Sequence, residues 1–258
     1  MRHLELGDGD ERILWLHGGN VAGWMWGPQV PDLPEYRSLV PDFPGFGDSA
    51  DEPWVSIADT ADRCAELLGD RPAHVVGLSL GSSVAIELAA RHPRLVTSLV
   101  LSSTQAVPPT RRDRMLVPLL LSFWNRPWFW TTTARAYGLE GEDAAQFVEN
   151  GLRIERATAV AIFEEVCRGI PRETLARVQA PTVAVAGEKD SSAVTRGSLE
   201  LLGRGIPGAV TAIAPGMHHQ WNVEAPELFT SLVREWITGR TLAPGLRATM
   251  ERQPPHPL

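Results

Sequence analysis

The chain has 258 residues, 43% of them hydrophobic, so it can bury a sizeable core in one α/β domain or in two small domains. Its formal net charge of -7 argues against a nucleic-acid-binding protein, because such proteins present a basic face to the phosphates. The longest apolar stretch, residues 116–124, contains Pro118 and is too short to span a bilayer.

Short strands and helices alternate over the first hundred residues. Strands are predicted at short runs of strand-forming residues, at 3–6, 13–16, 36–40, 75–76 and 96–101. A helix is predicted at residues 56–68, where apolar side chains recur at helical spacing and Ser56 can cap the first turn. Another helix is predicted at residues 80–91, which are mostly small and apolar.

The alternation stops at residues 105–178, which contain helical stretches and no clear strand. This insert is rich in aromatic side chains, namely Phe123, Trp124, Trp128, Phe129 and Trp130. They either line an apolar pocket or only hold the insert against the sheet, and the sequence leaves both interpretations open. Because the apolar run is short, lipase-like behaviour at a lipid interface is not expected.

After the insert the alternation resumes, with strands predicted at 182–186 and 210–214 and helices at 195–202 and 226–237. Short strands rich in Val and Leu that alternate with helices predict an α/β fold. Its sheet is expected to be mostly parallel, with helices on both faces and a helical cap insert.

The predicted domain organisation follows from where the alternation breaks. Residues 1–104 and 179–240 are expected to form the α/β core, and residues 105–178 a helical cap or lid. Residues 241–258, which contain four prolines, are expected to form a loosely ordered tail.

The segment GLSLG at residues 77–81 matches the pattern GxSxG. The pattern alone is weakly specific, but here it follows a predicted strand and precedes a predicted helix, as a nucleophile elbow does. The sharp turn explains glycine at both ends, and the helix N-terminus directs positive potential at Ser79. This context favours Ser79 as a nucleophile over an idle serine in a glycine-rich turn.

Two further segments follow predicted strands, at the end of the sheet where chemistry gathers. In HGGN, residues 17–20, the Gly19 N–H can form an oxyanion hole with the Leu80 N–H, although a plain Gly-Gly turn is the alternative. His17 is expected to be a structural hydrogen-bonding residue. In GEKD, residues 187–190, Asp190 is the preferred acid for fixing a histidine tautomer, while Glu188 and a solvated loop remain open.

The segment PGMHHQW at residues 215–221 follows the last predicted strand of the core and contains His218 and His219. Metal binding is one interpretation, but adjacent side chains rarely converge on one ion, and no Cys or third His lies nearby in the sequence. A general base at one of the two histidines is the better interpretation.

Together these segments resemble the α/β-hydrolase superfamily, in its smaller lidded esterase-like branch. The resemblance covers residues 12–239 and rests on HGGN, PDFPGFGDS, GLSLGSSVA, AGEKD and APGMHHQWNVEAPELF. It implies a catalytic triad in the chain order Ser79, Asp190, His219, because the spacing to Glu224 selects His219. In such proteins PDFPGFGDS is usually a structural corner, so no catalytic role is expected for it.

The sequence departs from its relatives at two points. Only one strand is predicted ahead of the one that ends at HGGN, where many relatives have two, so the sheet is expected to be one strand short. The elbow carries Leu78 where His or Trp is common, which does not affect the triad.

The resemblance implies acyl transfer to water, with Ser79 as nucleophile, His219 as base and Asp190 as the orienting acid. The N–H groups of Gly19 and Leu80 would receive the oxyanion, and no metal or organic cofactor is needed. The expected activity is that of a carboxylesterase on a small to medium apolar ester. The alternatives are carbon–carbon hydrolysis, the elimination of menaquinone-pathway relatives, or a ligand sensor that keeps the triad.

The sequence also indicates where the protein works. Its first ten residues, MRHLELGDGD, lack the apolar region of a secretory signal peptide. Cys64 and Cys167 do not form a disulfide framework, so we expect two free thiols in a reducing compartment. A cytoplasmic protein with a small-molecule substrate and no membrane insertion is therefore expected, with its oligomeric state open.

Overall fold

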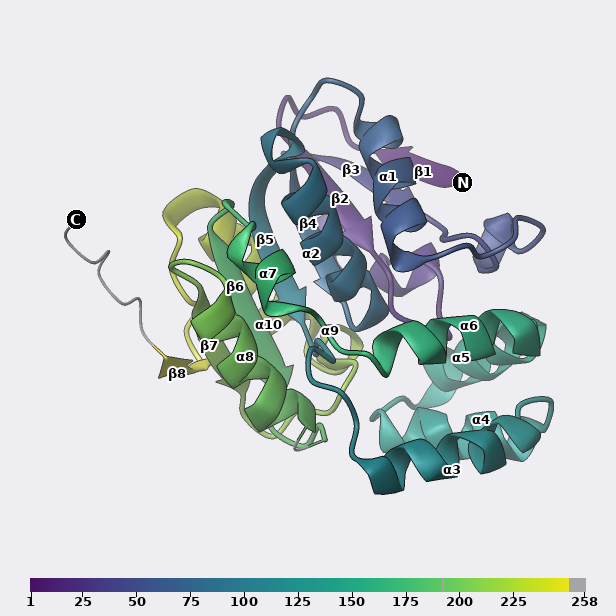
Figure 1. The fold of residues 1–258 in the computed structure, drawn as a ribbon. Coiled ribbons are helices and arrows are strands. Elements are labelled where there is room, and N and C mark those ends of the chain that lie inside the picture. The colour runs from purple at the N-terminus through teal and green to yellow at the C-terminus, as the bar shows by residue number, and fades with distance from the viewer. Residues whose placement is uncertain (192, 251–258) are drawn as a thin grey trace.

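A single mixed sheet runs through the computed structural model, which describes residues 1–191 and 193–250 (Figure 1). Its order among the described residues is β1-β3-β2-β4-β5-β6-β7-β8. The strands are β1 (His3–Leu6), β2 (Arg12–Leu16), β3 (Arg37–Pro41), β4 (Ala73–Leu78), β5 (Val96–Ser102), β6 (Thr182–Gly187), β7 (Val210–Ala214) and β8 (Arg247–Met250). Neighbours from β3 through β7 are parallel, while the edge strands β1 and β8 are antiparallel to their partners.

Helices cover both faces of this sheet, as the alternating pattern predicted. In Figure 1 the helices α1, α2, α7 and α8 lie in front of the sheet and α10 lies behind it. Their bounds, with that of the short α9, are α1 (Ile57–Leu68), α2 (Leu80–Arg91), α7 (Arg172–Ala176), α8 (Leu199–Gly205), α9 (Trp221–Glu224) and α10 (Pro226–Gly239). The Ser56 side chain caps α1 by accepting a hydrogen bond from the Asp59 N–H. The predicted α/β fold is confirmed.

The insert between β5 and β6 is helical and extends from the carboxyl end of the parallel strands (Figure 1). Its long helices are α3 (Arg111–Ser122), α4 (Pro127–Ala136), α5 (Gly141–Arg153) and α6 (Arg156–Val166). No helix in the described part of the chain is both long and apolar enough to cross a membrane.

The C-terminal segment differs from its prediction. Residues 247–250 form β8, with Ala248 opposite Ala212 of β7 and the Thr249 and Thr211 hydroxyls 2.8 Å apart. The expectation of a loosely ordered tail is therefore wrong for these residues, and residues 251–258 lie outside the described part. As predicted, only β1 precedes β2, the strand that ends at HGGN. Strand β8 lies at the opposite edge and brings the sheet to eight strands, so the sheet as a whole is not shortened in the way expected.

The predicted helix at 195–202 takes a different form. Residues 193–198 form a π-helical turn, and the α-helix α8 begins at Leu199. Both cysteines are free thiols, as predicted; Cys64 is buried and Cys167 is half-buried.

Candidate active site

Ser79 occupies a strained turn between β4 and α2. Its backbone φ of 53° lies in the left-handed region, which costs a non-glycine residue about 1–3 kcal/mol. The flanking glycines permit the turn, because a Cβ on Gly81 would lie 2.1 Å from the Leu16 carbonyl oxygen and one on Gly77 would lie 2.6 Å from the Gly81 carbonyl carbon. The GxSxG spacing therefore reflects steric contact between β2, β4 and the start of α2.

The serines near the elbow have different surroundings. The Ser82 hydroxyl is fully buried and donates toward the carbonyls of Gly77 and Ser102, at 2.8 and 3.1 Å. Ser79 is half-buried and lines a cavity of about 390 Å³. Of these two hydroxyls, that of Ser79 is the one available to a substrate.

Asp190 and His219 come from separate loops and meet beside this cavity. The His219 Nδ1 lies 2.8 Å from the Asp190 Oδ2, and the two side chains are 13% and 6% exposed. A carboxylate accepts the Nδ1–H, so this bond assigns the proton to Nδ1 and leaves Nε2 as the basic nitrogen. His219 and Asp190 line the same cavity as Ser79, and no hydrogen bond joins Ser79 to His219 among the described residues.

Glu188, the other candidate acid, points elsewhere. Its carboxylate is 2.8 Å from the Arg247 guanidinium and accepts a hydrogen bond from the Gly216 N–H. The Arg247 contact, with the Gly216 bond second, lowers the pKa of Glu188. Asp190 rather than Glu188 is thus placed against the histidine.

His218 is turned away from its neighbour. Its Nδ1 lies 3.0 Å from the Glu224 carboxylate, which also accepts a hydrogen bond from the His218 backbone N–H. The two histidines therefore contact different carboxylates and do not converge on one point. Within residues 1–191 and 193–250, no group of three or more His, Cys, Asp and Glu side chains could hold a metal ion.

Gly19 and Leu80 both line the cavity beside Ser79. Leu80 is the first residue of α2, so its N–H is one of the donors that a helix leaves without an intrahelical partner. A Cβ on Gly18 would lie 2.8 Å from the Leu78 side chain, whereas one on Gly19 would have no neighbour within 4 Å. The HGGN turn thus approaches the elbow closely and leaves open space in front of Gly19.

His17 supports this turn from inside the core. It is fully buried, its Nε2 accepts the Phe43 N–H at 2.9 Å, and its Nδ1 lies 2.7 Å from the Gly18 carbonyl oxygen. Burial lowers the pKa of His17 to about 4, so the ring is neutral at pH 7, with Nδ1 donating to Gly18. These contacts fit the structural role expected for His17.

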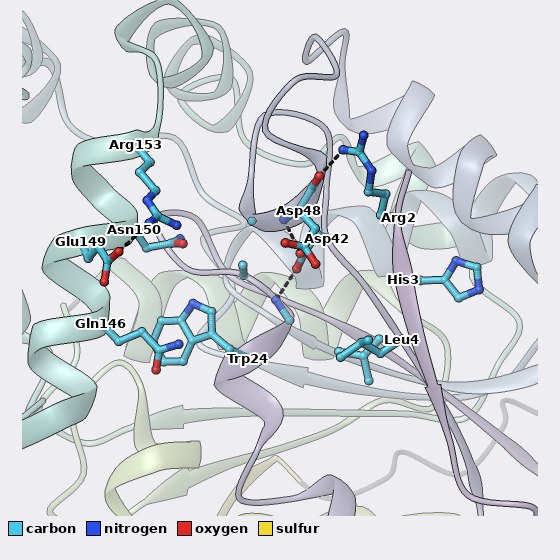
Figure 2. A pocket seen from close by; sticks show the side chains of 14 residues that line it. Arg2, His3, Leu4, Trp24, Asp42, Asp48, Gln146, Glu149, Asn150 and Arg153 are labelled. Atoms are coloured by element: carbon cyan, nitrogen blue, oxygen red, sulfur yellow. Dashed lines mark hydrogen bonds and ion pairs between the residues drawn. The ribbon is translucent and has the colours of Figure 1, made fainter.

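Asp42 joins the PDFPGFGDS corner to the chain that follows HGGN (Figure 2). Its two carboxylate oxygens accept hydrogen bonds from the Gly23 and Asp48 N–H groups, at 2.6 and 2.7 Å. Figure 2 shows these bonds among the residues that line a second cleft, of about 410 Å³, which shares no lining residue with the Ser79 cavity. The corner is therefore a structural support.

The cap supplies most of the apolar wall of the Ser79 cavity. Its contributions to the lining include Val117, Leu120, Trp124, Tyr137, Ile154, Ala159, Ile162, Phe163 and Val166. The charged side chains in the lining are Asp113 and Asp190, and none of the described lining residues is Lys or Arg. The cavity is therefore suited to an uncharged, largely apolar group.

The cap aromatics divide between the two roles left open by the sequence. Trp124 lines the cavity, and its indole N–H donates to the Ile154 carbonyl. Trp130 is fully buried within the cap and donates to the Trp124 carbonyl at 2.7 Å. Trp128 is 54% exposed and packs on Phe123, with ring centroids 5.0 Å apart.

Tyr137, at the end of α4, is a site residue that the sequence did not reveal. Its ring lies against His219, with centroids 4.7 Å apart and planes inclined by 33°. Burial, with a smaller contribution from the Asp190 charge, raises the pKa of Tyr137 to about 12. The following Gly138 packs closely on the histidine loop, because a Cβ there would lie 2.9 Å from the His218 Nδ1. The cap thus touches the histidine loop directly.

The chain is similar to known proteins in both sequence and fold. A family model for the alpha/beta hydrolase fold matches residues 11–137. An AB hydrolase superfamily protein of Gibberella zeae is 31% identical over 252 residues, which cover 92% of this chain and 83% of that protein. A pimeloyl-[acyl-carrier protein] methyl ester esterase of Aeromonas hydrophila subsp. hydrophila is 29% identical, over 90% of this chain and 96% of the esterase.

A solved structure extends the comparison to the whole fold. A hydrolase from Pseudomonas aeruginosa superposes with a TM-score of 0.80 at 24% identity, over 92% of this chain and 94% of that one. This agreement concerns the fold alone, whereas the Gibberella zeae protein establishes kinship by sequence. The chain belongs to the α/β-hydrolase superfamily.

Proposed function

We propose that this protein is a serine hydrolase that acts by acyl transfer to water, with a carboxylic ester of small to medium size as substrate. The observation that carries the proposal is the cavity of about 390 Å³ shared by Ser79 on its strained turn and the hydrogen-bonded His219–Asp190 pair. A nucleophile, a base and an orienting acid around one apolar cavity are the parts that ester hydrolysis requires.

The reaction begins when the Ser79 oxygen attacks the ester carbonyl and its proton passes to the His219 Nε2. Asp190 accepts the Nδ1–H of the resulting imidazolium and stabilises its charge. The Gly19 and Leu80 N–H groups receive the oxyanion. Collapse of this intermediate breaks the ester C–O bond, and His219 protonates the departing alkoxide to release the alcohol.

The second half of the reaction reverses these roles. A water molecule enters, His219 removes one of its protons, and the hydroxide oxygen attacks the acyl-serine. Collapse of the second intermediate releases the acid and returns the proton from His219 to Ser79. The cycle needs neither a metal nor an organic cofactor.

The cavity lining favours an apolar acyl or alcohol group, because the lining residues from the cap are mostly aliphatic and aromatic. The described lining offers no Lys or Arg to pair with a carboxylate of the substrate. The similarity to a methyl ester esterase supports an ester as the reacting group. We further propose that residues 105–178 act as the lid over this site.

The test compares the native protein with Ser79→Ala. A fluorophosphonate probe should label the native protein, and short-chain p-nitrophenyl esters should be turned over. Ser79→Ala should lose the labelling and nearly all turnover while keeping its circular dichroism spectrum. Ser82→Ala is the neighbouring-serine control and should keep the label.

Three outcomes would argue against the proposal. Labelling that persists in Ser79→Ala would assign the nucleophile to another residue. Labelling of Ser79 without turnover of any ester in a broad panel would favour a ligand sensor. Turnover only of substrates cleaved at a carbon–carbon bond would favour the carbon–carbon hydrolase alternative.

A further inference from the structure

Helix α3 carries large apolar side chains that face solvent. The exposed fractions are 79% for Met115, 46% for Leu116, 54% for Leu119 and 45% for Leu120, and Leu121 is the one buried residue of the helix. Helices of globular proteins normally turn such a stripe toward the core. Figure 1 shows α3 and α4 as the part of the cap farthest from the sheet.

Trp128 extends this apolar surface onto α4. It is 54% exposed, and its ring packs on Phe123, the residue that follows α3. We call the surface formed by Met115, Leu116, Leu119, Leu120 and Trp128 the cap face. Large contiguous apolar surfaces are uncommon on soluble proteins and mark sites of interaction.

Exposed arginines flank the cap face along the chain, although the chain as a whole is acidic. Between residues 111 and 135 there are five arginines and one aspartate, against a net charge of -7 for the protein. Arg111, Arg112 and Arg114 are exposed in the first turn of α3, and Arg126 is exposed just before α4. The local charge therefore attracts an anionic surface, whereas the rest of the molecule carries the opposite sign.

The cap face is continuous with the Ser79 cavity. Leu120 belongs to both, because it is 45% exposed on the cap face and also lines the cavity, as the half-buried Val117 does. Trp124, just beyond α3, lines the cavity as well. An apolar chain at the cap face would therefore lie next to residues that line the Ser79 cavity.

We propose that the cap face binds anionic lipid surfaces. Apolar side chains and a tryptophan flanked by arginines are the combination that holds an amphipathic helix at the boundary between lipid headgroups and acyl chains. A second copy of this chain fits less well, because a two-fold contact would bring the arginine-rich ends of both copies to the same interface. The short apolar run in the sequence suggested no interfacial behaviour, but exposure of one helix face does not depend on the length of that run.

Lipid binding itself does not depend on Ser79, whereas delivery of a lipid-like ester from the bound surface rests on the proposed esterase function. The experiment therefore measures binding first, by co-sedimentation with phosphatidylglycerol–phosphatidylcholine vesicles and with phosphatidylcholine vesicles. The native protein and Ser79→Ala should both bind the anionic vesicles. Binding should fall at least about tenfold on pure phosphatidylcholine or at high salt.

Variants of the cap face and its flanking arginines test the apolar and the charged contacts separately. Met115→Ser/Leu119→Ser and Arg111→Gln/Arg112→Gln should each weaken binding to anionic vesicles by about tenfold or more. None of these four residues lines the Ser79 cavity, so turnover of a water-soluble p-nitrophenyl ester should stay within about twofold of the native rate. Leu4→Ser and Arg94→Gln are the controls for the apolar and the charged variants. Both change exposed residues of the α/β domain, away from the cap.

Several results would overturn the proposal. One is a native protein that does not sediment with anionic vesicles; another is a loss of binding in the controls equal to that in the cap-face variants. A third is a dimer in light scattering that Met115→Ser/Leu119→Ser converts to a monomer, with no vesicle binding. Vesicle binding by a native protein that hydrolyses no ester would uphold the lipid surface and reject only the esterase function.

Discussion

His218 and His219 are adjacent in the sequence, yet their side chains have separate partners. His219 contacts Asp190 beside the Ser79 cavity, whereas His218 contacts Glu224. Two adjacent residues of one type thus have different contacts, because the loop between β7 and α9 turns their side chains in different directions.

Single substitutions should separate the two histidines. His219→Ala removes the base of the proposed mechanism and should lower kcat on an activated ester by roughly 10³-fold or more. His218→Ala removes a contact to Glu224 and should lower it by less than about tenfold. Steady-state turnover of p-nitrophenyl butyrate measures both. An inactive His218→Ala beside an active His219→Ala would reverse the assignment.

The Tyr137 ring packs against His219, so we expect it to hold the imidazole in position. Tyr137→Ala removes that ring and should lower kcat roughly ten- to hundredfold, because a misplaced catalytic group loses much of its advantage. Tyr137→Phe keeps the ring and should stay within about threefold of the native rate. The kcat and KM values of both variants on one soluble ester, over a range of pH, provide the measurement.

The paired variants separate two roles for Tyr137. Equal losses of kcat in Tyr137→Phe and Tyr137→Ala would show that the hydroxyl, rather than the ring, is required. An increase in KM alone would place Tyr137 in substrate binding, since it also lines the cavity.

At the scale of elements, the elbow depends on how closely α2 approaches β2. A methyl group at Gly81 would meet the Leu16 carbonyl oxygen, so Gly81→Ala should lower the free energy of unfolding by more than about 2 kcal/mol or prevent folding. Gly19→Ala adds the same methyl group where nothing lies within 4 Å, and it should change stability by less than about 1 kcal/mol.

Urea unfolding of both glycine variants provides the comparison. Gly19→Ala should nevertheless lose activity, because its methyl group would enter the space in front of the proposed oxyanion donor. Equal stability of the two variants would contradict the steric account of the GxSxG motif.

The regular elements could be predicted because their signals are local. The helix at 80–91 and the strand at 210–214 have the predicted bounds, since each is a run of small or apolar residues with turn residues at its ends. Strand β8 has a weaker signal: RATM alternates polar and apolar residues over only four positions, and its place depends on pairing with β7. Long-range pairing of this kind leaves little trace in one sequence.

The candidate site likewise contains residues that the sequence could predict and residues that it could not. Ser79 could be proposed because the elbow is a local motif with a steric cause, and GEKD and the histidine segment each follow a strand of the core. Tyr137 lies in an insert without motifs, and only the docking of the cap brings it to His219. The exposed side of α3 was missed for the same reason, since an apolar sequence does not state what covers it.

At the scale of the whole molecule, two buried histidines link stability to pH. His17 is fully buried below the HGGN turn, and His74 lies in β4, with its Nδ1 2.8 Å from the Ser98 hydroxyl. Burial lowers the pKa of each to about 4, from an ordinary value of 6.5. Both are therefore neutral in the folded protein at pH values where the unfolded chain already binds their protons.

This difference fixes the sign of the pH dependence. Between pH 6.5 and 4 the unfolded state holds more protons, so these histidines support full stability above pH 6.5 and progressively less as pH falls to 4. For His17 the loss should reach about 2–3 kcal/mol. The loss of stability between pH 7.5 and pH 4.5 can be measured by urea unfolding followed by tryptophan fluorescence. The measurement compares the native protein with His74→Gln. The variant lacks one of the two titrating groups and should lose less stability between these pH values; an unchanged loss would contradict the assignment to His74.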